Sequence, residues 1–189
     1  EDWVRICKEN PWEGLDLLVD AMPRTPKRAG MRSNAAVTFA LTPDALMDAW
    51  MRQLNVHGLR SFWVYDVLFN IDNMLRLAKV AQEFGSTCAG ALMFTLSPVH
   101  TDAYYADKAQ KLAASSDIDS ILIYDTAGVL EKERLSTLIP AIIAVPRGKP
   151  IELHANNILG QSGKAYLDAV DLGVTILHTS SRPLANGPA

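Results

Sequence analysis

Several features that mark other classes of protein are scarce in this sequence. The 18 basic residues are outnumbered by 21 acidic ones, which gives a net charge of −3 without a basic block, so we expect no nucleic-acid partner. The longest apolar runs, such as residues 138–145, are far too short for a membrane span. The two cysteines, Cys7 and Cys88, are expected to be free, buried thiols in a reducing compartment, which favours a cytoplasmic location.

Motifs for nucleotide binding and for secretion are missing too. Neither G-x-G-x-x-G nor G-K-[ST] occurs, so nucleotide binding has little support. The opening residues do not resemble a signal peptide. They also lack an initiator methionine, and we therefore expect the native chain to be longer.

What the sequence does contain is an alternation of strand and helix patterns. With 189 residues, 49% of them hydrophobic, it can form one domain with a substantial core. A helix is predicted over residues 11–21, and a second is predicted to start at Thr42-Pro43-Asp44 with Thr42 as its cap. Leu46, Ala49, Trp50 and Leu54 are spaced to share one face of that second helix. Six β-prone runs are centred at residues 30–31, 60–65, 88–94, 120–124, 151–154 and 174–178. Such alternation predicts parallel strands joined by right-handed crossovers.

Polar residues follow the predicted strands at regular intervals. Six of them lie 25 to 34 residues apart, about the length of one strand–helix unit, namely Arg32, Asp66, Thr95, Asp125, His154 and Thr179. A (βα)8 barrel builds its active site from the carboxyl ends of its parallel strands, and an open doubly wound sheet uses the same edge. We predict an α/β fold of the (βα)8 TIM-barrel type with parallel strands. Because only six strands are visible, two open edges should be closed by missing chain segments or other subunits.

Seven stretches of the sequence together match one protein family. They are ENPWEGLDLLVDAMPRTP, MRSNA, FWVYDVLFNIDNM, TLSPVHTDAYY, YDTAGVL, LHANNILGQSG and HTSSRPLANG. Together they resemble the carboxyltransferase domain of the biotin-dependent pyruvate carboxylase, oxaloacetate decarboxylase and transcarboxylase family, a group of metal-dependent lyase-type TIM barrels. Ser-Pro-Val-His-Thr is the most specific of these matches. The resemblance implies that residues 1–189 are a partial barrel, strands three to eight of the family fold.

The resemblance also implies a reaction and partners. The family transfers a carboxyl group between carboxybiotin and a 2-oxo acid of the pyruvate or oxaloacetate class. The biotinylation motif Ala-Met-Lys-Met is absent from this sequence, so the biotin should be attached to a separate carrier domain or chain. Carried over by position, Thr179 matches the family's catalytic, proton-carrying threonine. Arg32 matches the arginine that holds the substrate carboxylate, and Asp66 matches an aspartate of the substrate site.

The departures from the family fall on its metal site. His154 matches the first metal-binding histidine, but Tyr124 replaces the carbamylated lysine and Asn156 replaces the second histidine. The remaining ligand, an aspartate on the first strand, would precede Glu1. A phenol and a neutral amide are poor ligands for a transition metal at neutral pH, so we expect a diverged metal site that binds a divalent metal weakly if at all.

Three hypotheses for function follow. The first is an enzyme, a carboxyltransferase or 2-oxo acid decarboxylase domain whose activity is diverged or impaired. The second is a non-catalytic homologue with a role in the assembly of a larger complex or in binding a small acid. The third is a metal-free lyase or aldolase on the same barrel. Tyr124 and Asn156 are the positions that discriminate among these hypotheses.

Overall fold

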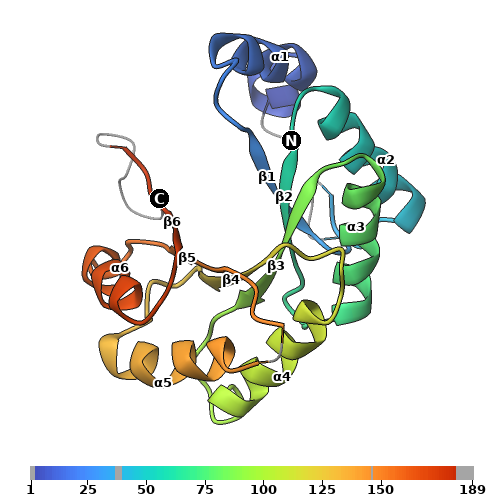
Figure 1. Ribbon diagram of the computed structural model, residues 1–189. Coiled ribbons are helices and arrows are strands. Elements are labelled where there is room, and N and C mark those ends of the chain that lie inside the picture. Colours follow the sequence, from blue (N-terminus) through green and yellow to red (C-terminus); the bar gives the residue numbers. More distant parts are fainter. Residues whose placement is uncertain (1–2, 37–39, 146, 182–189) are drawn as a thin grey trace.

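Six parallel strands form one curled sheet, shown in the computed structural model in Figure 1. The structure describes residues 3–36, 40–145 and 147–181, so the last matched stretch lies outside the described residues from position 182 onward. The strands follow one another in sequence order as β1 (Arg28–Arg32), β2 (Ser61–Tyr65), β3 (Thr87–Met93), β4 (Ser120–Asp125), β5 (Ile151–Ala155) and β6 (Ile176–His178). Every neighbouring pair is parallel. The curled sheet is a half-barrel, and it confirms the predicted fold class.

The helices alternate with the strands and lie mainly on the convex side of the sheet (Figure 1). They are α1 (Pro11–Ala21), α2 (Asp44–Val56), α3 (Ile71–Glu83), α4 (Asp102–Ala113), α5 (Lys132–Ile143) and α6 (Ser162–Asp171), preceded by a short π-helical turn, η1 (Trp3–Cys7). None of the helices in the described part of the chain combines the length and the apolar composition that a membrane span requires.

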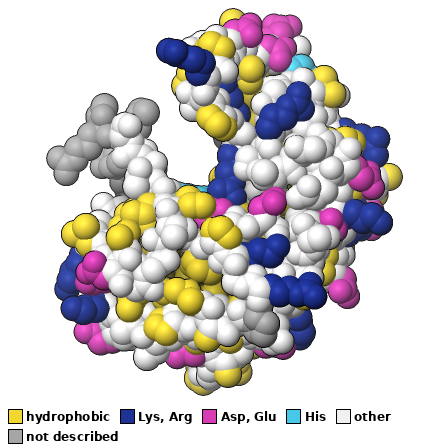
Figure 2. Space-filling model, viewed as in Figure 1, with side chains coloured by type: hydrophobic (Ala, Val, Ile, Leu, Met, Phe, Trp, Pro, Cys, Tyr) yellow, Lys and Arg dark blue, Asp and Glu magenta, His cyan; other side chains and the backbone are white. Residues whose placement is uncertain are grey.

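The two faces of the sheet carry different side chains because successive residues of a strand point to opposite faces. Phe62, Leu92 and Ile123 belong to the large core between the sheet and the helices. On the concave face, by contrast, the apolar cluster is small and lies around Ala91 and Leu122. Figure 2 shows this concave side as a hollow with charged side chains of both signs along its floor. The concave face is therefore the polar face, where a barrel carries its site.

The predicted boundaries agree closely with the structure. The helix over residues 11–21 is confirmed, and each strand ends within one residue of the expected position. One prediction about α2 was wrong. Thr42 does not cap this helix, because its hydroxyl oxygen accepts a hydrogen bond from the Ala36 amide, 3.2 Å away, while Pro43 takes the cap position. On the predicted apolar face, Trp50 and Leu54 pack against the core beside the buried Met47 and Met51, whereas Leu46 is exposed.

The cysteines also differ from expectation in one respect. Both are free, as predicted, but only Cys88 is buried, whereas Cys7 is exposed. Burial raises the pKa of the Cys88 thiol to about 12, so it stays protonated at neutral pH. Cys88 therefore behaves as a core residue on the helix-facing side of β3.

The strands at the two ends of the sheet predict how the isolated segment behaves. Within the described residues, β1 pairs only with β2, and β6 pairs only with β5. Unpaired backbone groups on an edge strand recruit other strands. Residues 1–189 expressed alone are therefore expected to self-associate, which light scattering coupled to gel filtration would detect. A monodisperse monomer that melts cooperatively would contradict this expectation.

Candidate functional site

One cavity at the carboxyl ends of the strands contains the arginine that the sequence singled out. It has a volume of about 520 Å³, and Arg32, Tyr65, Tyr124 and Thr126 are among its lining residues. Arg32 lies directly opposite Tyr65 in the pairing of β1 with β2. The rings of Tyr65 and Tyr124 meet edge to face, with centroids 5.5 Å apart. This cavity thus combines one cation with two phenols.

Burial and the neighbouring phenol of Tyr65 raise the pKa of Tyr124, and the positive charge of Arg32 only partly opposes them. The phenol of Tyr124 is therefore neutral at physiological pH and can donate a hydrogen bond. It does not supply an anionic oxygen.

A second cavity lies next to the first and contains the candidate threonine. It has a volume of about 260 Å³, and His154, Tyr166, His178 and Thr179 are among the residues that line it. Among the described residues, none lines both cavities. The ring of Tyr124 contacts that of His154 edge to face at 4.8 Å and so connects the two. The structure thus brings Tyr124 and His154 together, but it does not place Arg32 and Thr179 in one cavity.

His154 has neighbours at both ring nitrogens. Asn156 donates from Nδ2 to the Thr126 carbonyl at 2.8 Å, which leaves its Oδ1 as the acceptor 3.0 Å from His154 Nε2. The other nitrogen, Nδ1, lies 3.4 Å from Nδ1 of His178. Burial lowers the pKa of His154, and the charge of His178 lowers it further. The His154 ring is thus held in place by side chains from the loop after β5 and from β6.

The two aspartates predicted at the strand ends are buried, and both accept hydrogen bonds from backbone amides. The carboxylate of Asp66 accepts hydrogen bonds from the Ser33 hydroxyl and, at 2.8 Å, from the Leu68 amide. Asp125 accepts from the amides of Gly128 and Leu130 at 2.9 and 2.7 Å. Asp66 lines neither of the two cavities, although it was expected to contact substrate. Both carboxylates order the loops that follow their strands.

A charged cluster on the concave face was not anticipated from the sequence. Arg28 binds Glu152 through both terminal nitrogens, at 2.6 and 3.1 Å. Glu152 also accepts hydrogen bonds from His178 Nε2, at 2.8 Å, and from the hydroxyl of Ser120. Burial alone would raise the pKa of Glu152, but the hydrogen bonds from His178, Arg28 and Ser120 outweigh it and hold the pKa at about 2. This cluster fixes His178, and His178 in turn contacts His154.

The sequence pattern that could have revealed the cluster is alternation within a strand. Glu152 precedes His154 by two positions and therefore points to the same face of β5, as Arg28 does relative to residues 30 and 32 of β1. A charged residue inside an apolar strand, on the same face as a candidate residue, indicates a polar barrel interior.

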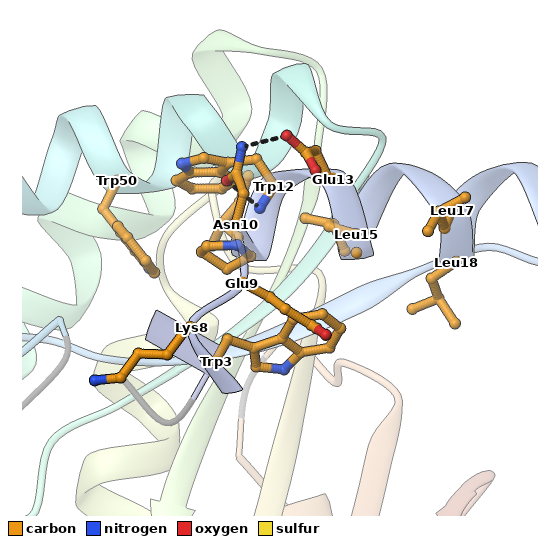
Figure 3. Close-up of a pocket in the computed structure, with 13 residues that line it drawn as sticks. Trp3, Lys8, Glu9, Asn10, Trp12, Glu13, Leu15, Leu17, Leu18 and Trp50 are labelled. Atoms are coloured by element: carbon orange, nitrogen blue, oxygen red, sulfur yellow. Dashed lines mark hydrogen bonds between the residues drawn. The ribbon is translucent and has the colours of Figure 1, made fainter. Parts of the chain in front are cut away.

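A larger cavity lies away from the strand ends. It has a volume of about 1020 Å³ and lies between η1, α1 and α2. Figure 3 shows Trp3, Trp12 and Trp50 around the start of α1, where Asn10 caps the helix through a 3.1 Å hydrogen bond from the Trp12 amide. None of the candidate residues lines this cavity.

The comparisons with known proteins agree with the fold and with the matched stretches. No family model matches the chain. One of the pyruvate carboxylase subunits of Methanothermobacter thermautotrophicus is 31% identical over 184 residues, which cover 97% of this chain and 32% of that protein. The corresponding pyruvate carboxylase subunit of Methanocaldococcus jannaschii is 29% identical over 184 residues, with the same coverage. The carboxyl transferase domain from Rhizobium etli pyruvate carboxylase, solved with pyruvate and biocytin, superimposes with a TM-score of 0.87 at 26% identity, over 93% of this chain and 30% of that one.

Over nearly its whole length this chain is similar to the carboxyltransferase domain of the pyruvate carboxylases. It spans about a third of the length of the two curated relatives. The half-barrel corresponds to part of the carboxyltransferase barrel of the Rhizobium etli protein.

The residues of this half-barrel do not fit the metal site that the family resemblance implies. Tyr124 presents a neutral phenol in place of a lysine carbamate, and the Nε2 atom of His154 is engaged with Asn156. Across the ranges that the structure describes, no group of three or more His, Cys, Asp or Glu side chains is arranged to hold a metal ion. Zinc, manganese and cobalt sites normally rest on several such anionic or imidazole ligands.

Proposed function

We propose that this chain is the acid-binding part of a carboxyltransferase barrel whose metal chemistry has diverged. Its substrate class is a small 2-oxo acid such as pyruvate or oxaloacetate. The observation that carries the proposal is the cavity that Arg32 shares with two phenols, next to a histidine bound by an amide. The Rhizobium etli relative, whose carboxyl transferase domain was solved with pyruvate and biocytin, supports the choice of ligand.

In this proposal Arg32 holds the carboxylate of the acid. A guanidinium presents a planar pair of donors that matches the two oxygens of a carboxylate, and such charge-assisted pairs are stronger than neutral hydrogen bonds. Asp66 acts indirectly, because its bonds to Ser33 and Leu68 order the loops that follow β1 and β2. Arg32 is thus the substrate-binding residue and Asp66 a supporting one.

Thr179 is proposed to carry the proton that accompanies carboxyl transfer, in the smaller cavity beside His154. The carboxyl group would arrive on biotin attached to a separate carrier domain or chain, which is therefore the proposed partner. Because Arg32 and Thr179 line separate cavities, any transfer would require the two to open into one. This separation supports an activity weaker than that of the family.

A non-catalytic role is the second candidate, and the His154–Asn156 contact favours it. Nε2 of His154 cannot coordinate a metal while it donates a hydrogen bond to Oδ1 of Asn156. Binding of a 2-oxo acid without carboxyl exchange to biotin would distinguish this role from that of an impaired enzyme.

Substitution of Arg32 tests the acid site. The intact protein is expected to bind pyruvate weakly, on the order of millimolar, because few contacts are available. Arg32→Lys keeps the charge but loses the paired donors, and should weaken binding several-fold, whereas Arg32→Ala should abolish it. Calorimetry or ligand-detected NMR would measure both.

Thr179→Val is the matched control for the arginine variants. It should bind pyruvate nearly as well as the parent, because the proposed role of Thr179 is proton transfer. Equal binding by the parent and by Arg32→Ala would show that this acid site does not exist and would leave assembly as the better account of the domain.

A further inference from the structure

Tyr65 and Tyr124 differ from Tyr105 and Tyr166 in the use of their hydroxyl groups. Tyr105 donates to the carbonyl of Met93 and accepts from the Thr95 amide, at 3.2 and 2.9 Å. Tyr166 is bound in the same way by the backbone of Ala155 and His178. By contrast, no described residue forms a hydrogen bond to the hydroxyl of Tyr65 or of Tyr124. Two half-buried phenols with unused polar groups therefore line the cavity that contains Arg32.

The position of these phenols relative to Arg32 suits one class of ligand. Tyr65 is the direct strand neighbour of Arg32, and Tyr124 is near enough for the charge of Arg32 to oppose part of the rise in its pKa. All three side chains line the same cavity of about 520 Å³. In a 2-oxo acid the carbonyl oxygen is adjacent to the carboxylate, so a donor beside the carboxylate-binding group meets the carbonyl oxygen. A neutral phenol is such a donor, and tyrosines serve as carbonyl and oxyanion donors in other sites.

We propose that Tyr65 and Tyr124 are the specificity-determining residues of the acid site and select 2-oxo acids over simple carboxylic acids by donating hydrogen bonds to the carbonyl oxygen. This inference rests on the proposed function, because it requires the carboxylate to be bound at Arg32. It assigns to Tyr124 a role that differs from that of the metal-binding lysine it replaces. A site built to hydrogen-bond a polar group discriminates against an analogue that lacks the group, since its donors then stay unpaired.

The test compares pyruvate with propionate, which has the same length and charge but no oxo group. Ligand-detected NMR on the intact protein is expected to show pyruvate binding at least about fivefold more tightly, the effect of roughly one net hydrogen bond. Tyr124→Phe should reduce this preference to near one while leaving propionate binding unchanged. Tyr65→Phe should act in the same direction and provides an independent second variant.

Two controls separate this inference from the acid site itself. Tyr104→Phe, on α4 and outside the cavity, should leave the preference intact, whereas Arg32→Ala should abolish binding of both acids. A parent protein that binds pyruvate and propionate equally, with no change in either phenylalanine variant, would overturn the inference while the acid site stands. Binding of neither acid by the parent protein would overturn the acid site and this inference with it.

Discussion

Replacement of Glu152 by alanine is expected to lower the free energy of unfolding by about 3–5 kcal/mol, the usual cost of breaking a buried ion pair by removing one partner. The Glu152 side chain is only 2% exposed and accepts hydrogen bonds from Arg28, Ser120 and His178. Its removal would leave the guanidinium of Arg28 without its carboxylate on the concave face of the sheet. The same change would release His178 and, through it, the neighbouring ring of His154.

Urea unfolding of the intact protein would measure the effect. Asp107→Ala is the matched control, because it also removes a carboxylate that pairs with a basic residue, Lys111, but on the exposed surface of α4. Exposed pairs contribute little to stability, so the control should unfold at nearly the same urea concentration as the parent. Equal unfolding of the Glu152→Ala variant and the parent would show that the charged cluster does not stabilise the barrel.

The pH dependence of the free energy of unfolding measures the contribution of Glu152 in a second way. The folded structure lowers the pKa of Glu152 from its ordinary 4.5 to about 2, so the ionised carboxylate stabilises the fold. This contribution is fully present above pH 4.5 and is lost as the pH falls from 4.5 toward 2. The stability difference between the parent and Glu152→Gln should therefore shrink over that interval. A difference that grows as the pH falls would have the wrong sign.

The fold could be predicted from the sequence because its determinants are local. Apolar runs separated by helical patterns specify parallel strands. Gly58, Gly85 and Gly173 each follow a helix and adopt the left-handed conformation that ends it, with φ of 89°, 67° and 103°. Tyr124 and His154 could be assigned to the site because each lies near the end of its strand. These features depend on residues only a few positions apart in the chain.

The features that could not be predicted from the sequence depend on the contacts that each side chain makes in the folded structure. Arg28 and Glu152 are 124 positions apart, and only the curl of the sheet brings their side chains together. Thr42 has the composition of a helix cap, but a loop amide from Ala36 takes its hydroxyl oxygen. Asp66 was assigned to the site from its spacing, and the spacing does not show that its carboxylate accepts a hydrogen bond from the Leu68 amide two positions on. Such local side-chain-to-backbone bonds are typical of aspartate in turns.

We propose that the barrel keeps an acid site and does not keep the family's metal. This claim rests on the two substituted positions, because the phenol of Tyr124 cannot form a carbamate and the amide of Asn156 occupies Nε2 of His154. The double variant Tyr124→Lys/Asn156→His restores the family's side chains and provides a positive control for metal uptake. The parent should also contain no modified lysine, which mass spectrometry of its peptides would show.

Elemental analysis of the intact protein beside its His154→Ala variant tests this claim most directly. We expect the zinc, manganese and cobalt contents of the two proteins to be equal, with no stoichiometric metal that depends on His154. One transition metal per chain in the parent, lost in the His154→Ala variant, would contradict the account and restore a metal-dependent carboxyltransferase.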